Sequence, residues 1–393
     1  MKRLLWVTPI EPRFEAGGGG EIRQAHLIAA LAERFEVHLL LAGRLTDERV
    51  RSLLGSVREV PASPAVDPPG RMRRRLRDIR WEILQRSSDE VARQRGLRRA
   101  LSAAIASGPP AELVCVEYVG LAPLIPRAHR GFWSLTLHNL PSQMARHNAA
   151  IAPGRRQRFM LGFEERNSRR VEHWALRAYD LVVAVSPEDA AALPAGAVVV
   201  PNGVETTRLS PTPLPGAPRV VFTGALHTLP NRDGIAWFCR EVWPAVRERI
   251  PEAELSVVGA RPPDEILALA ELEGVSVHPD VPDVAPFLEA ARVAVVPLRI
   301  GSGSRLKALE AMAAARPVVG TRIGLGGLEA ELDRDALAAD EPGAFAEALA
   351  RCLTDDALAR RLASNGRRLV EERYSWRRIG AGYASLLADR AGA

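Results

Sequence analysis

The sequence predicts an α/β protein made of two doubly wound domains that face a cleft. Short apolar runs alternate with helical patterns along the whole chain, which is typical of parallel sheets covered by helices. The chain has 393 residues, which is too long for a single hydrophobic core. A proline-rich stretch at residues 210–218 divides the alternation into two series. Since it can neither continue a helix nor join a central strand, we interpret it as the interdomain linker.

In the first series, a four-glycine loop follows the first predicted strand. Apolar residues at helical spacing predict a helix over residues 22–35, and the charged region 143–178 is also expected to be helical. Short apolar runs bounded by turn residues predict strands at residues 4–8, 37–41, 113–117, 133–137, 181–185 and 197–200.

The second series repeats the alternation after the proline-rich stretch. Strands are predicted at residues 219–223, 254–258, 275–278, 293–297 and 317–321. Helices are predicted at residues 233–249, 284–291, 304–315, 342–354 and 356–373. The final segment from residue 376 is expected to cross back to the first domain. In such domains ligands bind at the carboxyl ends of the strands.

Composition indicates a soluble globular protein, with 47% hydrophobic and 25% charged residues. No apolar run is long enough for a transmembrane helix, and the N-terminus lacks the pattern of a signal peptide. Cys115, Cys239 and Cys352 are far apart and form no metal or disulfide pattern. We therefore expect a cytoplasmic protein whose cysteines are small buried hydrophobes.

The net charge of +6 favours an anionic partner. The densest basic run extends from Arg71 to Arg86, and its apolar residues recur at helical spacing. With Trp81 among its arginines, this amphipathic helix could rest on the anionic inner face of a membrane. The alternative is a surface helix whose arginine stems cover the core. No recognised motif supports nucleic-acid binding.

Lys307 is the most informative residue of the sequence. Of the 53 Lys and Arg residues, only positions 2 and 307 are Lys. Lys offers a compact point charge where Arg offers a planar fork, so one retained internal Lys suggests a specific need. It follows a Gly/Ser loop between a predicted strand and helix, which is the geometry of an anion site. Arg305 and Glu310 lie in the same segment.

Other candidate residues also follow predicted strands. Gly18, Gly19 and Gly20 could let the backbone approach a ligand closely, although a flexible loop is the alternative. His138 follows an apolar strand and could bind a sugar hydroxyl or move a proton, or be structural. With the segment from Gly224 to Asn231, these residues suggest a site for phosphate and sugar. No Asp-x-Asp metal motif or glycosidase carboxylate pair occurs.

These motifs resemble the retaining glycosyltransferases of group 1, of the family 4 type, which have the GT-B fold of two Rossmann-like domains. The resemblance covers nearly the whole chain and is strongest from residue 220 to 328. The matching motifs are Gly224 to Asn231, Trp237-Phe238, Val242-Trp243-Pro244, Val258-Gly259, Val281-Pro282-Asp283, Pro297 to Ala313 and Pro317-Val318-Val319.

The resemblance implies transfer of a sugar from a nucleotide-diphosphate sugar, with UDP- and GDP-sugars favoured. The acceptor would be a hydroxyl of a cell-envelope glycan or lipid, or of a small natural product. Neither a metal nor another cofactor is implied, and no protein nucleophile is needed. Residues 1–208 would bind the acceptor, with residues 376–393 crossing back, and residues 218–375 would bind the donor.

Individual roles are carried over from the same resemblance. His138, Arg305 and Lys307 would be catalytic, with His138 on the transferred sugar and the two cations on the diphosphate. Glu310 would bind the ribose. The implied donor-binding residues are Gly18, Gly19, Gly20, Gly224, Asn231, Arg261, Val281, Ser302, Gly303, Ser304, Leu306 and Glu310.

The sequence departs from the family pattern at three positions. Ser302 stands where the family has its first glutamate, and Leu226 and His227 stand where it has Arg and Lys. Arg305 and Lys307 would replace the lost charge. The alternatives are a non-catalytic scaffold that binds a sugar nucleotide or a membrane surface, and a GT-B nucleotide-sugar epimerase. Against the epimerase, the first domain lacks an evident set of acidic and His bases beyond His138.

Overall fold

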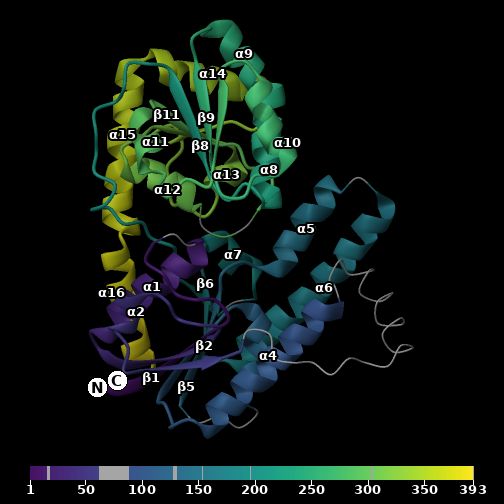
Figure 1. Cartoon of the computed structure of the whole chain (residues 1–393), viewed down its shortest axis with the longest axis vertical. Coiled ribbons are helices and arrows are strands. Elements are labelled where there is room, and N and C mark those ends of the chain that lie inside the picture. The colour runs from purple at the N-terminus through teal and green to yellow at the C-terminus, as the bar shows by residue number, and fades with distance from the viewer. Residues whose placement is uncertain are drawn as a thin grey trace. The chain divides into compact units, whose positions relative to one another are not determined.

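The computed structural model describes residues 1–15, 18–61, 88–126, 131–152, 154–194, 196–301, 303 and 305–392. The chain divides into two compact units (Figure 1). Unit 1 contains Met1–Val200 and Gly380–Ala393, and unit 2 contains Pro201–Ile379. The predicted basic helix from Arg71 to Arg86 lies outside the described residues.

Unit 1 is built on a seven-stranded sheet with the order β3-β2-β1-β4-β5-β6-β7. Every neighbouring pair is parallel. The chain starts in the middle and changes direction between β1 and β4, which is the doubly wound arrangement. The strands are β1 (Lys2–Thr8), β2 (Phe35–Ala42), β3 (Ser56–Val60), β4 (Leu113–Glu117), β5 (Phe132–Leu137), β6 (Leu181–Ala184) and β7 (Ala197–Val199).

The helices of unit 1 bury apolar side chains against this sheet. Gly380 of α16 lies so close to α1 that a β-carbon there would be 2.5 Å from the Ala30 side chain, which makes a glycine necessary. The helices are α1 (Gly19–Ala32), α2 (Glu48–Arg51), α4 (Ser88–Ser107), η1 (Val119–Leu124), α5 (Pro141–Ile151), α6 (Arg155–Ala178), α7 (Pro187–Ala192) and α16 (Trp376–Arg390), which begins in unit 2.

Unit 2 repeats the plan with six parallel strands in the order β10-β9-β8-β11-β12-β13. Its change of direction falls between β8 and β11. The strands are β8 (Arg219–Thr223), β9 (Glu254–Gly259), β10 (Val275–Pro279), β11 (Val293–Val296), β12 (Val318–Gly320) and β13 (Leu337–Ala338). The two sheets confirm the predicted fold class.

An aromatic cluster lies in the core of unit 2, where Phe345 packs edge-on against Phe238 at 5.6 Å between ring centroids. The helices are α8 (Leu229–Trp237), η2 (Phe238–Val242), α9 (Trp243–Arg249), α10 (Asp264–Leu267), η3 (Ala268–Glu271), α11 (Ala285–Ala290), α12 (Leu306–Ala313), α13 (Arg322–Leu325), α14 (Pro342–Thr354), α15 (Asp356–Leu369) and η4 (Val370–Tyr374).

Three predicted helices are interrupted. The one expected over residues 356–373 changes at Val370 from α15 to the π-helical segment η4. The helix expected over residues 233–249 contains a π-helical turn, η2, just before Pro244. Proline has no N–H for the α-helical ladder, so a locally wider turn is accommodated there. The region 143–178 forms two helices, because Gly154 is extended and begins α6 anew.

The interpretation of residues 210–218 as the interdomain linker is corrected by the structure. The chain passes from unit 1 to unit 2 at Val200, and the proline-rich stretch belongs to unit 2. Arg316 is fully buried and donates to the carbonyls of Thr212 and Pro213, and Arg292 donates to that of Pro215. These carbonyls lack helical or sheet partners, so the arginines satisfy them.

The three cysteines are buried and free, as expected. Burial raises the pKa of each thiol to about 12, so all three are protonated and unreactive at neutral pH. Among the described residues, no helix combines the length and the apolar character needed to cross a bilayer.

Candidate functional site

The candidate donor-binding residues lie after the strands on both sides of the change of direction in unit 2. Gly224 follows β8, Arg261 follows β9, and the loop to Lys307 follows β11. In doubly wound sheets, ligands bind outside the carboxyl ends of the strands at this point. Figure 1 shows α8, α12 and α13 at the same end of the sheet of unit 2.

Lys307 and Asn231 are brought together although they are far apart in the sequence. The Lys307 ammonium donates to Oδ1 of Asn231 at 2.5 Å. Nδ2 of Asn231 in turn donates to the carbonyl of Ala225, at 2.9 Å. The ammonium also lies 4.2 Å from the centroid of the buried Phe222 ring, within the range of a cation–π contact. Asn231 therefore positions Lys307 against the loop that follows β8.

Two glycines make room for this arrangement. A β-carbon on Gly224 would lie 2.6 Å from Nζ of Lys307 and 2.9 Å from Nδ2 of Asn231. A β-carbon on Gly259 would lie 1.7 Å from the carbonyl oxygen of Gly224. Any side chain at either position would displace the Lys307 ammonium or the loop that supports it.

Burial and the neighbouring Arg305 lower the pKa of Lys307 to about 7, although Glu310 acts in the opposite direction. Desolvation penalises the ammonium, and a second cation repels it. At neutral pH, Lys307 is therefore close to half protonated. An anion that binds beside it would restore the full charge.

Arg305 is 8% exposed, and its guanidinium is hydrogen-bonded to the surrounding backbone. Its guanidinium donates to the carbonyl of Ile323 at 3.0 Å and to that of Gly303 at 3.2 Å. Arg305 thus joins the loop after β11 to α13, and contributes positive charge to the Lys307 site through space. Ser302 and Ser304 of the same loop lie outside the described residues.

Glu310 lies one turn after Lys307 on α12 and is half-buried. Burial raises the pKa of its carboxyl, and Asp283 adds to this, whereas Arg208 and Lys307 oppose it. Arg208 donates to Asp283 at 2.9 Å. Sequence reasoning missed Arg208, because it comes from the segment before β8 and reaches this cluster only through the tertiary fold.

Arg261 is paired with His227. The Arg261 guanidinium lies 2.8 Å from Nε2 of His227, and the Arg261 N–H donates to Asp280 at 2.8 Å. Both side chains are exposed. Leu226, by contrast, is fully buried. At positions 226 and 227 the cations of the family pattern are absent, and the Arg261 guanidinium, which follows β9, supplies one positive charge beside His227.

The remaining predicted donor-binding residues of unit 2 flank these groups. Leu306 is half-buried and is the first residue of α12, and Gly303 is buried in the loop before it. Val281 is half-buried in the segment after β10.

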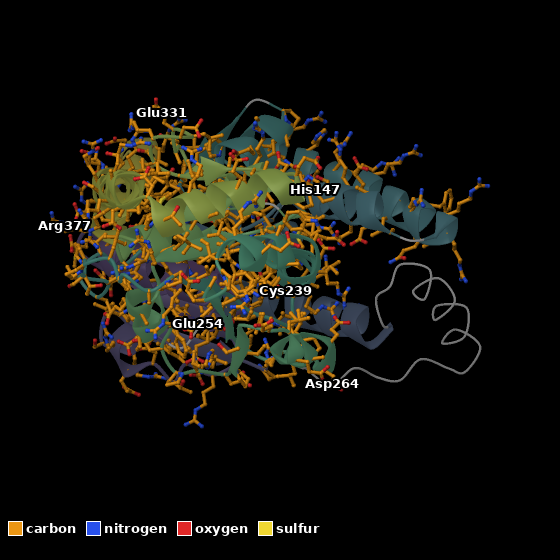
Figure 2. The ribbon with its side chains drawn as sticks, turned by 90° about the horizontal axis from the view of Figure 1, so that it is seen from above. His147, Cys239, Glu254, Asp264, Glu331 and Arg377 are labelled. Carbon is orange, nitrogen blue, oxygen red and sulfur yellow. The ribbon has the colours of Figure 1, made fainter. Side chains whose placement is uncertain are left out.

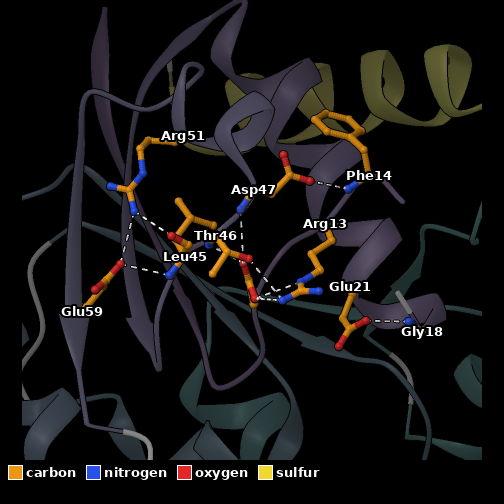
Figure 3. Close-up of polar contacts among 10 residues, drawn as sticks. Arg13, Phe14, Gly18, Glu21, Leu45, Thr46, Asp47, Arg51 and Glu59 are labelled. Carbon is orange, nitrogen blue, oxygen red and sulfur yellow. Dashed lines mark hydrogen bonds and ion pairs between the residues drawn. The ribbon is translucent and has the colours of Figure 1, made fainter. Parts of the chain in front are cut away.

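In unit 1, Gly19 and Gly20 form the first turn of α1 instead of the loop that was predicted. Glu21 accepts from the N–H of Gly18 at 2.6 Å, which closes the start of the helix (Figure 3). The N–H groups of such a first turn have no partner within the helix and suit an anionic or hydroxyl ligand.

The loop before these glycines is firmly attached, as Figure 3 shows. Glu11 accepts hydrogen bonds from Thr46 and from Arg13. Burial opposes ionisation of Glu11, but these donors lower its pKa overall. Asp47 accepts from the N–H of Phe14 at 3.0 Å and caps α2. The segment from Glu11 to Phe14 is therefore held by the loop that precedes α2.

His138 has a buried acidic partner that sequence reasoning missed. Its Nε2 lies 2.6 Å from Oε2 of Glu117, whose side chain is fully buried. Glu117 is the last residue of β4, and β5, which precedes His138, is the neighbouring strand. When Nε2 donates to Glu117, Nδ1 becomes the acceptor. The signal in the sequence was a carboxylate that ends an otherwise apolar strand.

Tyr118 completes this cluster. Its ring stacks on His138 with 4.0 Å between centroids and an angle of 8°. Its φ of 73° is unusual for a residue other than glycine, and such strain is often kept at functional positions. A β-carbon on Gly20 would lie 2.1 Å from the Tyr118 hydroxyl. Any larger side chain at position 20 would collide with the Tyr118 hydroxyl, so this position requires glycine.

The structure thus brings the predicted residues together in two sets, one in each unit. The set in unit 2 contains Gly224, Asn231, Lys307 and the residues around them. The set in unit 1 contains Gly18 to Gly20 and His138. Among the described residues, no three His, Cys, Asp or Glu side chains gather where they could hold one metal ion.

Comparison with known proteins agrees with this geometry. Residues 217–355 match the family model "Glycosyl transferases group 1". That range lies within unit 2 and includes both Gly224 and Lys307. Among curated protein sequences, none matches the chain.

Solved structures match nearly the whole chain. Sucrose-phosphate synthase from Thermosynechococcus elongatus is similar with a TM-score of 0.73 and 21% identity, over 99% of each chain. HepE from Anabaena, solved with UDP and glucose, gives a TM-score of 0.65 and 14% identity over 99% of this chain and 100% of its own. A TarM variant from S. aureus, solved with UDP, fondaparinux and α-GlcNAc-glycerol, gives 0.68 and 11% identity over 100% of each chain.

At these identities, the neighbours establish the GT-B fold, and the family model matches residues of unit 2 alone. The chain therefore has the GT-B fold, and its second unit is similar to the group 1 glycosyl transferases.

Proposed function

We propose that the protein is a retaining transferase that moves a sugar from a nucleotide-diphosphate sugar to a hydroxyl acceptor. The observation that carries this proposal is the Lys307 ammonium, held by Asn231 at 2.5 Å at the change of strand order in unit 2. Its pKa of about 7 makes its charge responsive to an anion. UDP is the favoured nucleotide, because two of the similar structures were solved with UDP.

In this proposal, the leaving diphosphate is stabilised by fixed charges. Lys307 neutralises the developing negative charge directly, and Arg305 adds positive potential from its buried position. The first turn of α12 contributes N–H groups to the same loop. We propose that these groups suffice without a metal ion.

Glu310 is proposed to bind the ribose of the donor. A carboxyl with a raised pKa retains proton-donating capacity closer to neutral pH, so it can either donate to or accept from a ribose hydroxyl. In unit 1, the His138–Glu117 pair is proposed to act on a hydroxyl of the transferred sugar. Glu117 fixes the imidazole, and Nδ1 is left for the substrate.

A donor screen tests the proposal. Thermal unfolding is followed with UDP, GDP, ADP and TDP, each with Mg²⁺ and with a chelator. A nucleotide at 100 times its Kd should stabilise the fold by about 2.7 kcal/mol. We expect UDP to raise the Tm equally with and without Mg²⁺, and Lys307→Met to remove the shift. If none of the nucleotides shifts the Tm, the assigned donor site is wrong.

A nucleotide-sugar epimerase is the second candidate, because the Glu117–His138 pair supplies the acidic partner that the sequence did not reveal. The two functions differ in what they release. An epimerase converts the sugar nucleotide without an acceptor and frees no nucleoside diphosphate. Product analysis of a UDP-sugar with and without added hydroxyl acceptors therefore separates them.

A further inference from the structure

The outer face of α6 exposes large aromatic side chains to solvent. Phe159 is 76% exposed, Phe163 48% and Trp174 42%. Single exposed hydrophobic residues are ordinary, but a gathering of them marks an interaction surface. The opposite side of α6 buries Leu161 and Ala175, and α6 packs along α5 (Figure 1). The aromatic side chains are therefore on the free face of a well-attached helix.

Arginines share this face with the aromatic side chains. Positions 155, 159, 163, 166, 170, 174 and 177 follow one another at steps of three and four residues, which places them on one side of an α-helix. All seven are exposed. We call this set the α6 face, and its members are Arg155, Phe159, Phe163, Arg166, Arg170, Trp174 and Arg177.

The acidic residues of α6 lie on its other sides. Glu172 is buried and accepts two hydrogen bonds from Ser142, one from the N–H and one from the hydroxyl. Glu165 pairs with Arg169 at 2.7 Å, away from the α6 face. The neighbouring helix α5 contains no Asp or Glu. The α6 face is thus cationic as well as aromatic, and Figure 2 shows nitrogen-tipped side chains projecting from these teal helices.

This combination matches an anionic lipid surface. Helices that lie in the plane of a membrane interface place arginines among phosphates and bury aromatic rings at the headgroup boundary. With 24 residues, α6 is about 36 Å long, so its aromatic groups can engage several lipids at once. A helix-to-helix contact between two proteins is disfavoured, because four arginines on the face would have to be desolvated.

We propose that the protein docks on anionic membranes through the α6 face. The contact is peripheral: the aromatic rings enter the headgroup region and the arginines pair with lipid phosphates. The inference does not depend on the proposed transfer reaction, since docking is measured without turnover. It is also separate from the predicted basic helix between Arg71 and Arg86.

Flotation of the full chain with vesicles tests the proposal. One set of vesicles is phosphatidylcholine alone, and the other contains equal parts of phosphatidylcholine and phosphatidylglycerol. The wild type should float with the anionic vesicles only, and high salt should release it. The charge-reversal variant is Arg155→Glu, Arg166→Glu and Arg170→Glu. The aromatic variant is Phe159→Ala, Phe163→Ala and Trp174→Ala.

Each arginine near an anionic surface contributes about a fivefold factor in binding. Loss of three arginines should therefore weaken vesicle binding by about 100-fold, and their replacement by glutamate should weaken it by more. The matched control makes the same change in net charge on exposed arginines of unit 2, with the substitutions Arg240→Glu, Arg249→Glu and Arg378→Glu. This control should float as the wild type does.

Three results would overturn the proposal. One is equal flotation of the wild type and the charge-reversal variant. Another is equal loss in the matched control, because binding would then follow net charge alone. The third is a wild type that ignores vesicles but self-associates, or binds a single-stranded oligonucleotide, through the aromatic residues. All substituted side chains are exposed, and an unchanged Tm of each variant verifies folding.

Discussion

Protonation of Lys307 should control nucleotide affinity in a pH range where few other side chains titrate. Its pKa is about 7, because burial and Arg305 disfavour the ammonium. A bound diphosphate favours the ammonium and raises that pKa. The free protein therefore has to take up a proton before tight binding whenever the pH exceeds 7. Affinity should fall as the pH rises, since fewer molecules have the charge.

The size of the effect follows from the fraction that is protonated. With a pKa of about 7, about half of the molecules have the ammonium at pH 7 and about 1% at pH 9. If only the ammonium form binds tightly, the apparent Kd of UDP should rise about 50-fold over this range. The terminal phosphate of UDP has a second pKa of about 6, so it is about nine-tenths ionised at pH 7 and adds little slope of its own above that pH.

Isothermal titration calorimetry measures both consequences. The Kd of UDP is determined from pH 7 to pH 9, and the number of protons taken up at pH 7 is obtained from buffers of different ionisation enthalpy. We expect uptake of about half a proton. Lys307→Met retains the apolar stem without the amine, so its Kd should be weak and independent of pH. A wild-type Kd that stays flat between pH 7 and pH 9 would refute the reasoning.

Three further predictions concern single residues. Gly224→Ala should raise the Kd of UDP by about tenfold or more, because the added methyl group would lie 2.6 Å from the Lys307 ammonium and displace it. The control is Gly343→Ala, where no atom lies within 4 Å of the added carbon. It should leave the Kd unchanged in the same titration. Glu117→Gln should lower kcat by about 10- to 100-fold while UDP binding persists, because it weakens the hydrogen bond that orients the His138 ring. An unchanged kcat would show that the pair is structural. Phe345→Ala should destabilise the fold by about 3 to 5 kcal/mol in urea unfolding, because it empties the aromatic core of unit 2; a loss below 1 kcal/mol would mean that the core closes around the cavity.

The buried strands of both sheets could be predicted from the sequence because they are continuous apolar runs. The strands Leu113–Glu117 and Arg219–Thr223 begin and end where expected. β3 was not predicted, since Ser56–Val60 is a mostly exposed edge strand with no apolar pattern. α2 was missed because four residues are too few to show a helical period.

The candidate site was predictable where glycines, a lone lysine and strand ends coincide in one segment. Glu117 and Arg208 were missed for a different reason. Glu117 meets His138 because β5 is adjacent to β4 in the sheet. Arg208 is brought to the site by its hydrogen bond to Asp283, which lies in a distant segment. Pairing between strands and loops is a property of the tertiary fold, so a local pattern cannot reveal it.

The presence of Lys and not Arg at position 307 has a physical explanation. The Lys307 ammonium lies against Gly224 and Asn231, and a planar guanidinium is larger than an ammonium, so it would need more room beside the loop after β8. Arginine would also remain charged at every relevant pH, and a permanent cation near the buried Arg305 would destabilise the empty site. A lysine with a pKa of about 7 avoids part of that cost by releasing its proton, and it regains the charge when a diphosphate arrives. In a chain where arginine is used almost everywhere else, this difference accounts for the one internal lysine.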